Sequence, residues 1–302
     1  MQMLDDLDQL RAADKSGFLA RLYDLPGSYE GPDGLRSEPY GAIGFGEAAN
    51  LPLLLGSWFD AKVVVGGTQF LLAGGFDHGE LAPLKLSSEL AGAGVVVAGY
   101  AAHEPDFEIA RGPLSLYQYA CYLAYATGHD QVLTQAEEAM LQLRTRLAPA
   151  TGTAENPAKT LAWTLWNRIA LFIAGREAAG LPQQLQHVFA RTGKSLAVTA
   201  GEHPLEFAAG AFETRKELGD EVIAVVVGPE DEEMRLAREV LGTRVSQVEQ
   251  LDLPGLPIHD PGGRALVLWY YAMHVAAYLA LLHGHSPEDN EVYEKLVGAA
   301  HG

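Results

Sequence analysis

The chain has 302 residues, of which 48% are apolar and 20% are charged, and its formal net charge is −18. This length and apolar content suffice for two medium-sized hydrophobic cores and give no reason to expect long disordered segments. The acidic balance repels nucleic-acid phosphates and anionic membranes, so we expect neither as a partner. A phosphorylated ligand would need a local device, such as a helix N-terminus, to overcome the same repulsion.

Targeting signals and cysteine usage favour a soluble cytoplasmic protein. The N-terminus is acidic, whereas a secretory signal is basic and then apolar. The longest apolar stretch, residues 265–282, contains His274 and fits a buried helix better than a membrane span of about 20 apolar residues. The single cysteine, Cys121, lies in an apolar run, so we expect no disulfide within the monomer.

The first half of the chain begins with helical patterns and continues with alternating strands and helices. Apolar residues recur at helical spacing in residues 1–24, and residues 25–40 have the composition of a loop. The predicted strands are 42–44, 62–65, 69–73 and 94–98. The predicted helices are 47–56, 81–90 and 114–147, the last with a break at 128–130.

The second half repeats this alternation after a connector at residues 148–157. The predicted strands are 169–174, 195–199, 222–227 and 244–248. The predicted helices are 157–166, 181–191, 204–218, 230–241 and 262–283. Short apolar strands between helices are typical of a parallel sheet covered on both faces. We therefore predict an α/β fold with an N-terminal subdomain of residues 1–150 and a C-terminal subdomain of residues 151–302.

A family resemblance is carried by Glu155-Asn156-Pro157-Ala158-Lys159, the strand near Phe172 and the segment Phe189–Lys194. In these segments the chain resembles the bifunctional phosphoglucose/phosphomannose isomerases, which have the sugar isomerase (SIS) fold. The resemblance covers most of the chain loosely and residues 155–210 best. It implies two SIS-like three-layer αβα sandwiches with mostly parallel sheets, a homodimer, and a sugar phosphate or sugar derivative as ligand, with no cofactor.

The family's first strand–helix loop, of the type Gly-Gly-Ser-Gly, corresponds to Gly44-Phe45-Gly46-Glu47. The resemblance implies that Gly44 and Gly46 bind substrate through the backbone. Glu47, however, stands where the family has a hydroxyl. The segment is therefore either an altered ligand loop or a simple turn in which Glu47 is an acid of the first helical turn.

The family's second loop, Ser-x-Ser-Gly-Asn-Thr, corresponds to residues 73–80 and implies substrate binding at Gly75. Its hydroxyls are replaced, and Asp77, His78 and Glu80 appear instead. Asp77 and His78 form either a new polar site or an N-cap followed by a solvated histidine. A hollow lined by Glu47, Asp77 and Glu80 would suit an unphosphorylated or cationic ligand better than phosphate. The family's Pro-Arg pair corresponds to Pro113-Leu114, with Arg111 displaced.

The family's catalytic base is a glutamate in a Phe-Asn-Glu-Asn-x-Lys motif. The corresponding segment is Phe189-Ala190-Arg191-Thr192-Gly193-Lys194. Arg191 occupies the glutamate position, and an arginine cannot act as a base at physiological pH. The resemblance therefore implies that Arg191 and Lys194 contact the anionic oxygens of the substrate.

Aldose–ketose isomerisation also needs a proton shuttle between C1 and C2 and a group that opens the sugar ring. The family's ring-opening histidine corresponds most nearly to His203, displaced by two positions. Glu202 or Glu206 would then be the proton shuttle. The family's C-terminal lysine lies nearest to Lys295, which the resemblance implies is catalytic, although the helix phase favours Val297.

Two hypotheses for the function follow. The first is an isomerase of glucose-6-phosphate, and also of mannose-6-phosphate. The second is a catalytically degenerate protein that binds or senses a sugar derivative, with the fold kept and the phosphate-binding and base residues lost. His283 and His285 flank Gly284 and predict a helix C-cap rather than a metal site, because no Cys or third His lies at ligand spacing. We expect no metal.

Overall fold

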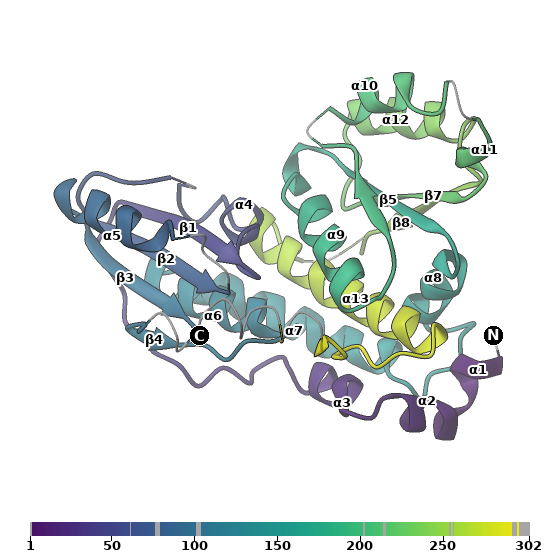
Figure 1. Ribbon diagram of the computed structural model, residues 1–302, viewed down its shortest axis with the longest axis horizontal. Coiled ribbons are helices and arrows are strands. Elements are labelled where there is room, and N and C mark those ends of the chain that lie inside the picture. Colours follow the sequence, from purple (N-terminus) through teal and green to yellow (C-terminus); the bar gives the residue numbers. More distant parts are fainter. Residues whose placement is uncertain are drawn as a thin grey trace. The chain divides into compact units, whose positions relative to one another are not determined.

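In the computed structural model, the described residues are 2–60, 62–75, 79–100, 104–201, 203–213, 216–253, 255, 257–291 and 295. The chain forms two compact units (Figure 1). Unit 1 comprises Met1–Pro26, Glu137–Pro257 and Val267–Asp289. Unit 2 comprises Gly27–Ala136, Ile258–Leu266 and Asn290–Gly302. The division of the sequence at residue 150 stays a prediction.

Unit 2 contains sheet A, a four-stranded parallel sheet in the order β1-β2-β3-β4. Its strands are β1 (Tyr40–Gly46), β2 (Thr68–Gly74), β3 (Gly94–Gly99) and β4 (Phe107–Glu108). The helices that follow them are α4 (Leu51–Leu54), α5 (Leu81–Leu90) and α6 (Ser115–Thr127). Because Gly46 pairs with Gly74, the loops after β1 and β2 begin side by side.

Sheet A is covered by helices on both faces. Successive side chains of a strand point to opposite sides, so neighbouring residues of β2 meet different helices. On one face, Leu81 of α5 packs into a cluster with Leu71 and Val97. On the other face, the ring of Tyr122 in α6 lies edge-on to Phe70, with centroids 6.0 Å apart. Sheet A is therefore the middle layer of a three-layer sandwich (Figure 1).

Unit 1 contains sheet B, a four-stranded parallel sheet in the order β6-β5-β7-β8. Its strands are β5 (Ile169–Ala174), β6 (Ala197–Thr199), β7 (Val222–Val227) and β8 (Gln247–Leu251). A 3₁₀ turn (Arg176–Ala178) follows β5. The helices of this segment are α8 (Pro157–Leu165), α9 (Leu181–Arg191), α10 (Pro204–Gly210), α11 (Lys216–Gly219) and α12 (Glu232–Leu241).

Sheet B is also the middle layer of a sandwich. Leu171 points to the face where Ala208 of α10 and Met234 of α12 are buried. Phe172 points to the opposite face, where its ring lies 4.8 Å from that of Phe189 in α9. Two parallel sheets with helices on both faces confirm the predicted fold class.

The remaining helices are α1 (Gln2–Asp5), α2 (Leu7–Ala13), α3 (Phe18–Tyr23), α7 (Asp130–Leu147) and α13 (Pro261–Leu282). By length and composition alone, α13 could cross a membrane, but its most apolar window is 100% buried within the protein. The helix is therefore a core helix, as is usual in a soluble protein. This confirms the prediction of a buried helix.

Several predicted elements differ from the structure. The predicted strand 62–65 is a loop in which the backbone N–H of Val64 donates to the side chain of Gln69 at 3.0 Å. Val64 is buried without strand pairing, whereas Val65 is 80% exposed. The predicted helix 47–56 is helical only in α4, and the predicted helix 204–218 is divided because Ala211 is extended. β8 begins at Gln247 rather than residue 244, and the short strand β4 was not predicted.

The Asn156-Pro157-Ala158-Lys159 motif has a structural role at the start of α8. The Asn156 side chain caps the helix by accepting from the backbone N–H groups of Ala158 and Lys159, at 3.0 and 3.1 Å. Lys159 is fully buried, and its Nζ donates to the carbonyl oxygens of Pro149 and Thr151, both at 2.8 Å. The lysine therefore fixes the connector that the sequence predicted between the two halves.

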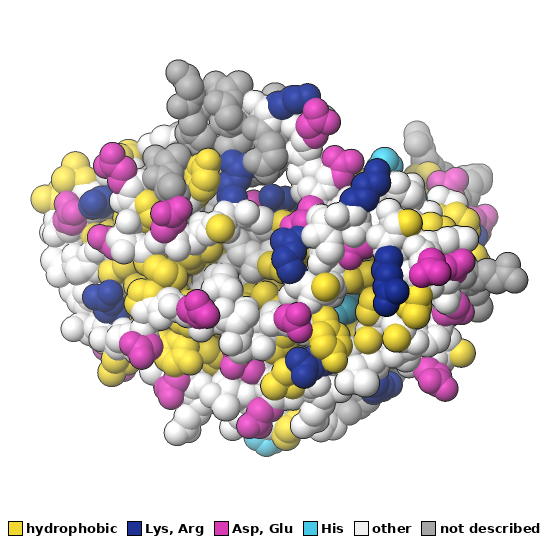
Figure 2. Space-filling view, turned by 90° about the horizontal axis from the view of Figure 1, so that it is seen from below, with side chains coloured by type: hydrophobic (Ala, Val, Ile, Leu, Met, Phe, Trp, Pro, Cys, Tyr) yellow, Lys and Arg dark blue, Asp and Glu magenta, His cyan; other side chains and the backbone are white. Residues whose placement is uncertain are grey.

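The surface carries charges of both signs. Figure 2 shows Asp and Glu side chains interspersed with Lys and Arg on the face that it draws. The net charge of −18 therefore means that acidic side chains outnumber basic ones. On the face drawn, the basic side chains lie among the acidic ones, so its potential is not uniformly negative. A cation that binds an anionic ligand can therefore act locally.

Candidate functional site

The carboxyl edge of sheet A brings together the glycines predicted to bind substrate. A Cβ added to Gly44 would lie 1.9 Å from the carbonyl oxygen of Ala48. A Cβ added to Gly46, whose φ is +57°, would lie 2.8 Å from the carbonyl oxygen of Gly74 and 3.0 Å from Cα of Gly75. The end of β1 therefore needs glycine at both positions, and Gly44, Gly46 and Gly75 lie at the edge where parallel α/β sheets bind ligands.

Glu47 follows these glycines and is 5% exposed. Its Oε2 accepts a hydrogen bond from Ser115 Oγ at 2.7 Å and one from the backbone N–H of Gly112 at 3.1 Å. Glu47 is not an acid of the first turn of α4, which begins at Leu51, so that interpretation was wrong. The carboxylate is instead directed to the start of α6, where two donors and the helix dipole stabilise its charge.

The second loop contributes fewer described groups. Asp77 and His78 lie outside the described residues, so neither interpretation of that pair is tested. Glu80 is exposed at the N-terminus of α5 and its side chain does not cap the helix. The sequence predicted a hollow lined by Glu47, Asp77 and Glu80. The carboxylate of Glu47 does not line it, because it is buried and accepts hydrogen bonds from Ser115 and Gly112.

Arg111 lies beside this edge. Its guanidinium carbon lies 5.0 Å from the centroid of the Tyr100 ring, which is cation–π geometry. The backbone N–H of Tyr100 donates to the carbonyl oxygen of Ala73 at 3.0 Å, at the end of β2. The sequence had singled out Arg111 only as displaced from the family's Pro-Arg pair. It missed Ser115, whose only signal was its position at the start of an apolar helix.

The predicted ring-opening and proton-shuttle residues lie after β6 in unit 1. His203 is exposed at the N-cap position of α10, and its side chain does not cap the helix. Glu206 is an exposed acid in the first turn of the same helix. Glu202 lies outside the described residues. His203 and Glu206 are thus near one another on one short helix at the carboxyl end of sheet B.

Arg191 and Lys194 lie at the other end of sheet B, because α9 runs back to the amino end of β6. The Nζ of Lys194 donates to the carbonyl oxygens of Arg191 and Asp289, at 2.6 and 2.5 Å. Burial lowers the pKa of Lys194, which the nearby Asp289 partly opposes. Within unit 1, the structure therefore brings Arg191 and Lys194 together but does not bring them to His203 and Glu206.

Lys295 is exposed and forms an ion pair with Glu291 at 2.5 Å. Gly284 follows α13 with φ +76°, and the N–H groups of His283 and His285 donate to carbonyls of the last helical turn. This geometry confirms the predicted C-cap. Among the residues that the structure describes, no group of three or more His, Cys, Asp and Glu side chains is placed to hold a metal ion.

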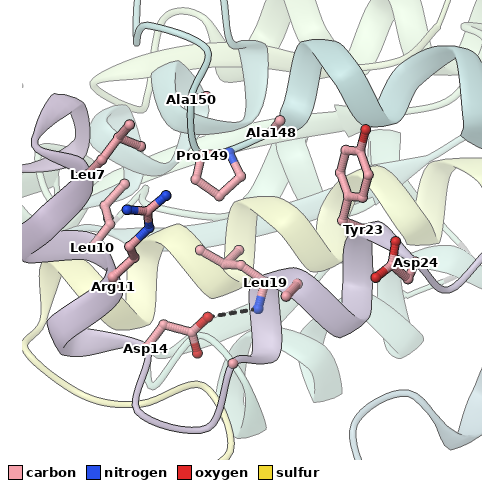
Figure 3. Close-up of a pocket in the computed structure, with 12 residues that line it drawn as sticks. Leu7, Leu10, Arg11, Asp14, Leu19, Tyr23, Asp24, Ala148, Pro149 and Ala150 are labelled. Carbon is pink, nitrogen blue, oxygen red and sulfur yellow. Dashed lines mark hydrogen bonds between the residues drawn. The ribbon is translucent and has the colours of Figure 1, made fainter.

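A separate apolar groove lies in unit 1, between α2, α3 and residues 148–150 (Figure 3). Its volume is about 480 Å³, and its walls include Leu7, Leu10 and Pro149. The Asp14 side chain at its edge accepts from the backbone N–H groups of Phe18 and Leu19, at 2.8 and 2.9 Å. The residues that line the groove include none of the predicted site residues.

Two family models match the chain. Residues 18–128 match the phosphoglucose isomerase N-terminal domain, and residues 154–296 match the bacterial phospho-glucose isomerase C-terminal SIS domain. The crystal structure of a glucose-6-phosphate isomerase-like protein from Thermus thermophilus is 36% identical, with 99% of each chain covered and a TM-score of 0.86. The chain belongs to the phosphoglucose isomerase family. This confirms the resemblance predicted from the sequence.

More distant structures share the fold. A glucose-6-phosphate isomerase from Chlamydia trachomatis is 10% identical, with a TM-score of 0.58 over 97% of this chain and 72% of that one. A glucosamine-6-phosphate deaminase from Thermotoga maritima is 12% identical, with a TM-score of 0.53 over 93% and 96% of the two chains. No curated protein matches the chain.

Proposed function

We propose that this protein is an aldose–ketose isomerase that interconverts glucose-6-phosphate and fructose-6-phosphate, and also accepts mannose-6-phosphate. The observation that carries the proposal is the 36% identity, over 99% of both chains, to a glucose-6-phosphate isomerase-like protein. The position of Gly44, Gly46 and Gly75 at the carboxyl edge of sheet A supports it, because parallel α/β sheets bind ligands at that edge.

The reaction requires ring opening and transfer of a proton between C1 and C2. We assign ring opening to His203 and the proton shuttle to Glu206 or Glu202. The exposed positions of His203 and Glu206 on α10 leave both groups able to exchange protons with a ligand. Lys295 remains a proposed catalytic residue. Arg191 and Lys194 lie at the other end of sheet B from His203 and Glu206, so within one subunit we do not propose them as contacts of the same substrate molecule. We further propose a cytoplasmic homodimer that uses no cofactor.

The test is turnover of fructose-6-phosphate to glucose-6-phosphate by the wild type and by His203→Ala, Glu206→Gln and Glu202→Gln. Loss of the proton shuttle is expected to lower kcat by about 10²–10⁴-fold. Glu239→Gln is the matched control, because Glu239 is an exposed acid that pairs with Arg235 on α12. Its activity should equal that of the wild type.

When the wild type is active, the variants assign the roles. If the wild type is active and Glu206→Gln is not, Glu206 is the shuttle. If only Glu202→Gln is inactive, the shuttle is Glu202. Full activity in all variants contradicts the assigned roles, whereas binding without turnover in the wild type favours the alternative of a degenerate sugar-binding protein.

A further inference from the structure

Glu47 links two parts of the chain that meet at the carboxyl edge of sheet A. Its backbone N–H donates to the carbonyl oxygen of Gly74 at 3.1 Å, which places its main chain between the ends of β1 and β2. Its side chain, 5% exposed, accepts from Ser115 Oγ and from the N–H of Gly112. The donors at the start of α6 that could hold an anion are therefore bound to a carboxylate of the chain itself.

Arg111 precedes Gly112 directly, so the same hydrogen bond fixes its main chain. Its side chain reaches Tyr100, over whose ring the guanidinium carbon lies at 5.0 Å. Tyr100 is in turn anchored at the end of β2 by its 3.0 Å hydrogen bond to Ala73. Arg111 is thus held at its main chain by Glu47, after β1, and at its side chain by Tyr100, after β3. The half-buried arginine lies along the carboxyl edge of sheet A.

We propose that Arg111 binds the phosphate group of the sugar phosphate, and that Glu47 is the positioning residue that holds Arg111 in place. This inference rests on the proposed substrate class but not on turnover. The loops after β1 and β2, residues 47–50 and 75–80, contain no serine or threonine that could donate to a phosphate, and the chain has a net charge of −18. The guanidinium of Arg111 would supply both the hydrogen-bond donors and the positive charge that a phosphate needs here. Its planar donors match the phosphate oxygens in pairs, and its charge acts locally.

The roles of the two residues differ in chemistry. Arg111 would touch the ligand, so its removal should weaken binding directly. Glu47 would act only through Gly112 and Arg111. Glu47→Gln keeps the size of the side chain and one acceptor oxygen but loses the charge that strengthens both hydrogen bonds. It should therefore weaken ligand binding less than Arg111→Gln does.

The experiment measures the dissociation constants of fructose-6-phosphate and of inorganic phosphate by calorimetry, on the full chain, for wild type and variants. Arg111→Gln should weaken the binding of both by about tenfold or more, and Arg111→Lys by less. Glu47→Gln should weaken binding about three- to tenfold. Where the wild type is active, KM should rise in proportion, while kcat changes less. Arg235→Gln, on the exposed face of α12, should bind as the wild type does.

The double variant separates positioning from a general loss of structure. If Glu47 acts through Arg111, Glu47→Gln combined with Arg111→Gln should bind no worse than Arg111→Gln alone. If the two substitutions weaken binding independently, so that their fold-changes multiply in the double variant, the positioning role of Glu47 is overturned. If Glu47→Gln does not fold, Ser115→Ala removes only the hydroxyl that Glu47 accepts from, and the same coupling is expected.

The remaining outcomes are also decisive. Unchanged binding of both ligands by Arg111→Gln would overturn the inference, as would a wild type that binds neither. A wild type that binds fructose-6-phosphate through Arg111 without converting it would contradict the proposed function and leave this inference standing.

Discussion

Lys159 gives the sharpest prediction about stability, because a fully buried ammonium holds the connector between the two halves of the sequence. Its Nζ donates to the carbonyl oxygens of Pro149 and Thr151 at 2.8 Å and lies 3.8 Å from the carboxylate of Asp5. Lys159→Met keeps the aliphatic volume but leaves two carbonyl groups without donors. Each unsatisfied buried group costs about 1–3 kcal/mol.

Part of this cost is offset, because burial lowers the pKa of Lys159 and the charge is itself expensive to keep inside the protein. We therefore expect the free energy of unfolding to fall by about 2–4 kcal/mol. Equilibrium urea unfolding, followed by circular dichroism and by tryptophan fluorescence, measures the change and tests whether the two probes coincide.

Lys85→Met is the matched control, because Lys85 is exposed on α5. A surface substitution of this kind should change stability by no more than about 0.5 kcal/mol. If Lys159→Met is as stable as Lys85→Met, the ammonium does not hold residues 149–151, and the structural account of the Asn156–Lys159 motif is refuted.

Further predictions concern the glycine turn and a buried histidine. Gly44→Ala places a Cβ 1.9 Å from the carbonyl oxygen of Ala48 and should lower stability by about 2–3 kcal/mol, whereas Gly34→Ala, which meets nothing within 4 Å, should be neutral; equal melting temperatures would contradict this. Burial lowers the pKa of His274 to about 4, from a usual 6.5. Between these values the unfolded chain binds the proton and the folded chain does not, so stability should fall with pH from 6.5 to 4, by about 3 kcal/mol. His274→Gln should remove that slope in urea titrations at each pH, and an unchanged slope would exclude His274 as its source.

Elements with continuous apolar patterns were predictable from the sequence. β7 (Val222–Val227) is buried along its whole length, and α13 is buried throughout its most apolar window. Such runs leave few alternatives, because both faces of the element must meet the core. The loop at residues 62–65 shows the opposite case. Val64 is buried although it belongs to no strand, and apolar character alone cannot distinguish these situations.

The site was less predictable, because its contacts join distant positions. Ser115 lies 68 residues after Glu47, so no local pattern indicated that the carboxylate would be held by the start of α6. Conversely, Lys194 and His203 are close in sequence but lie at opposite ends of β6, since a strand separates them. The alternation of strands and helices placed the two loops after β1 and β2, whereas the partners of Glu47 and Arg111 required the three-dimensional structure.

The central claim is that this chain catalyses aldose–ketose isomerisation, and its most direct test is proton transfer itself. Fructose-6-phosphate incubated with the wild type in D₂O, and followed by NMR, should give glucose-6-phosphate that carries solvent deuterium at C2, because a carboxylate shuttle exchanges its proton with water. Glu206→Gln and Glu202→Gln show which carboxylate delivers it. Fructose-6-phosphate that binds but shows neither conversion nor deuterium incorporation would contradict the account.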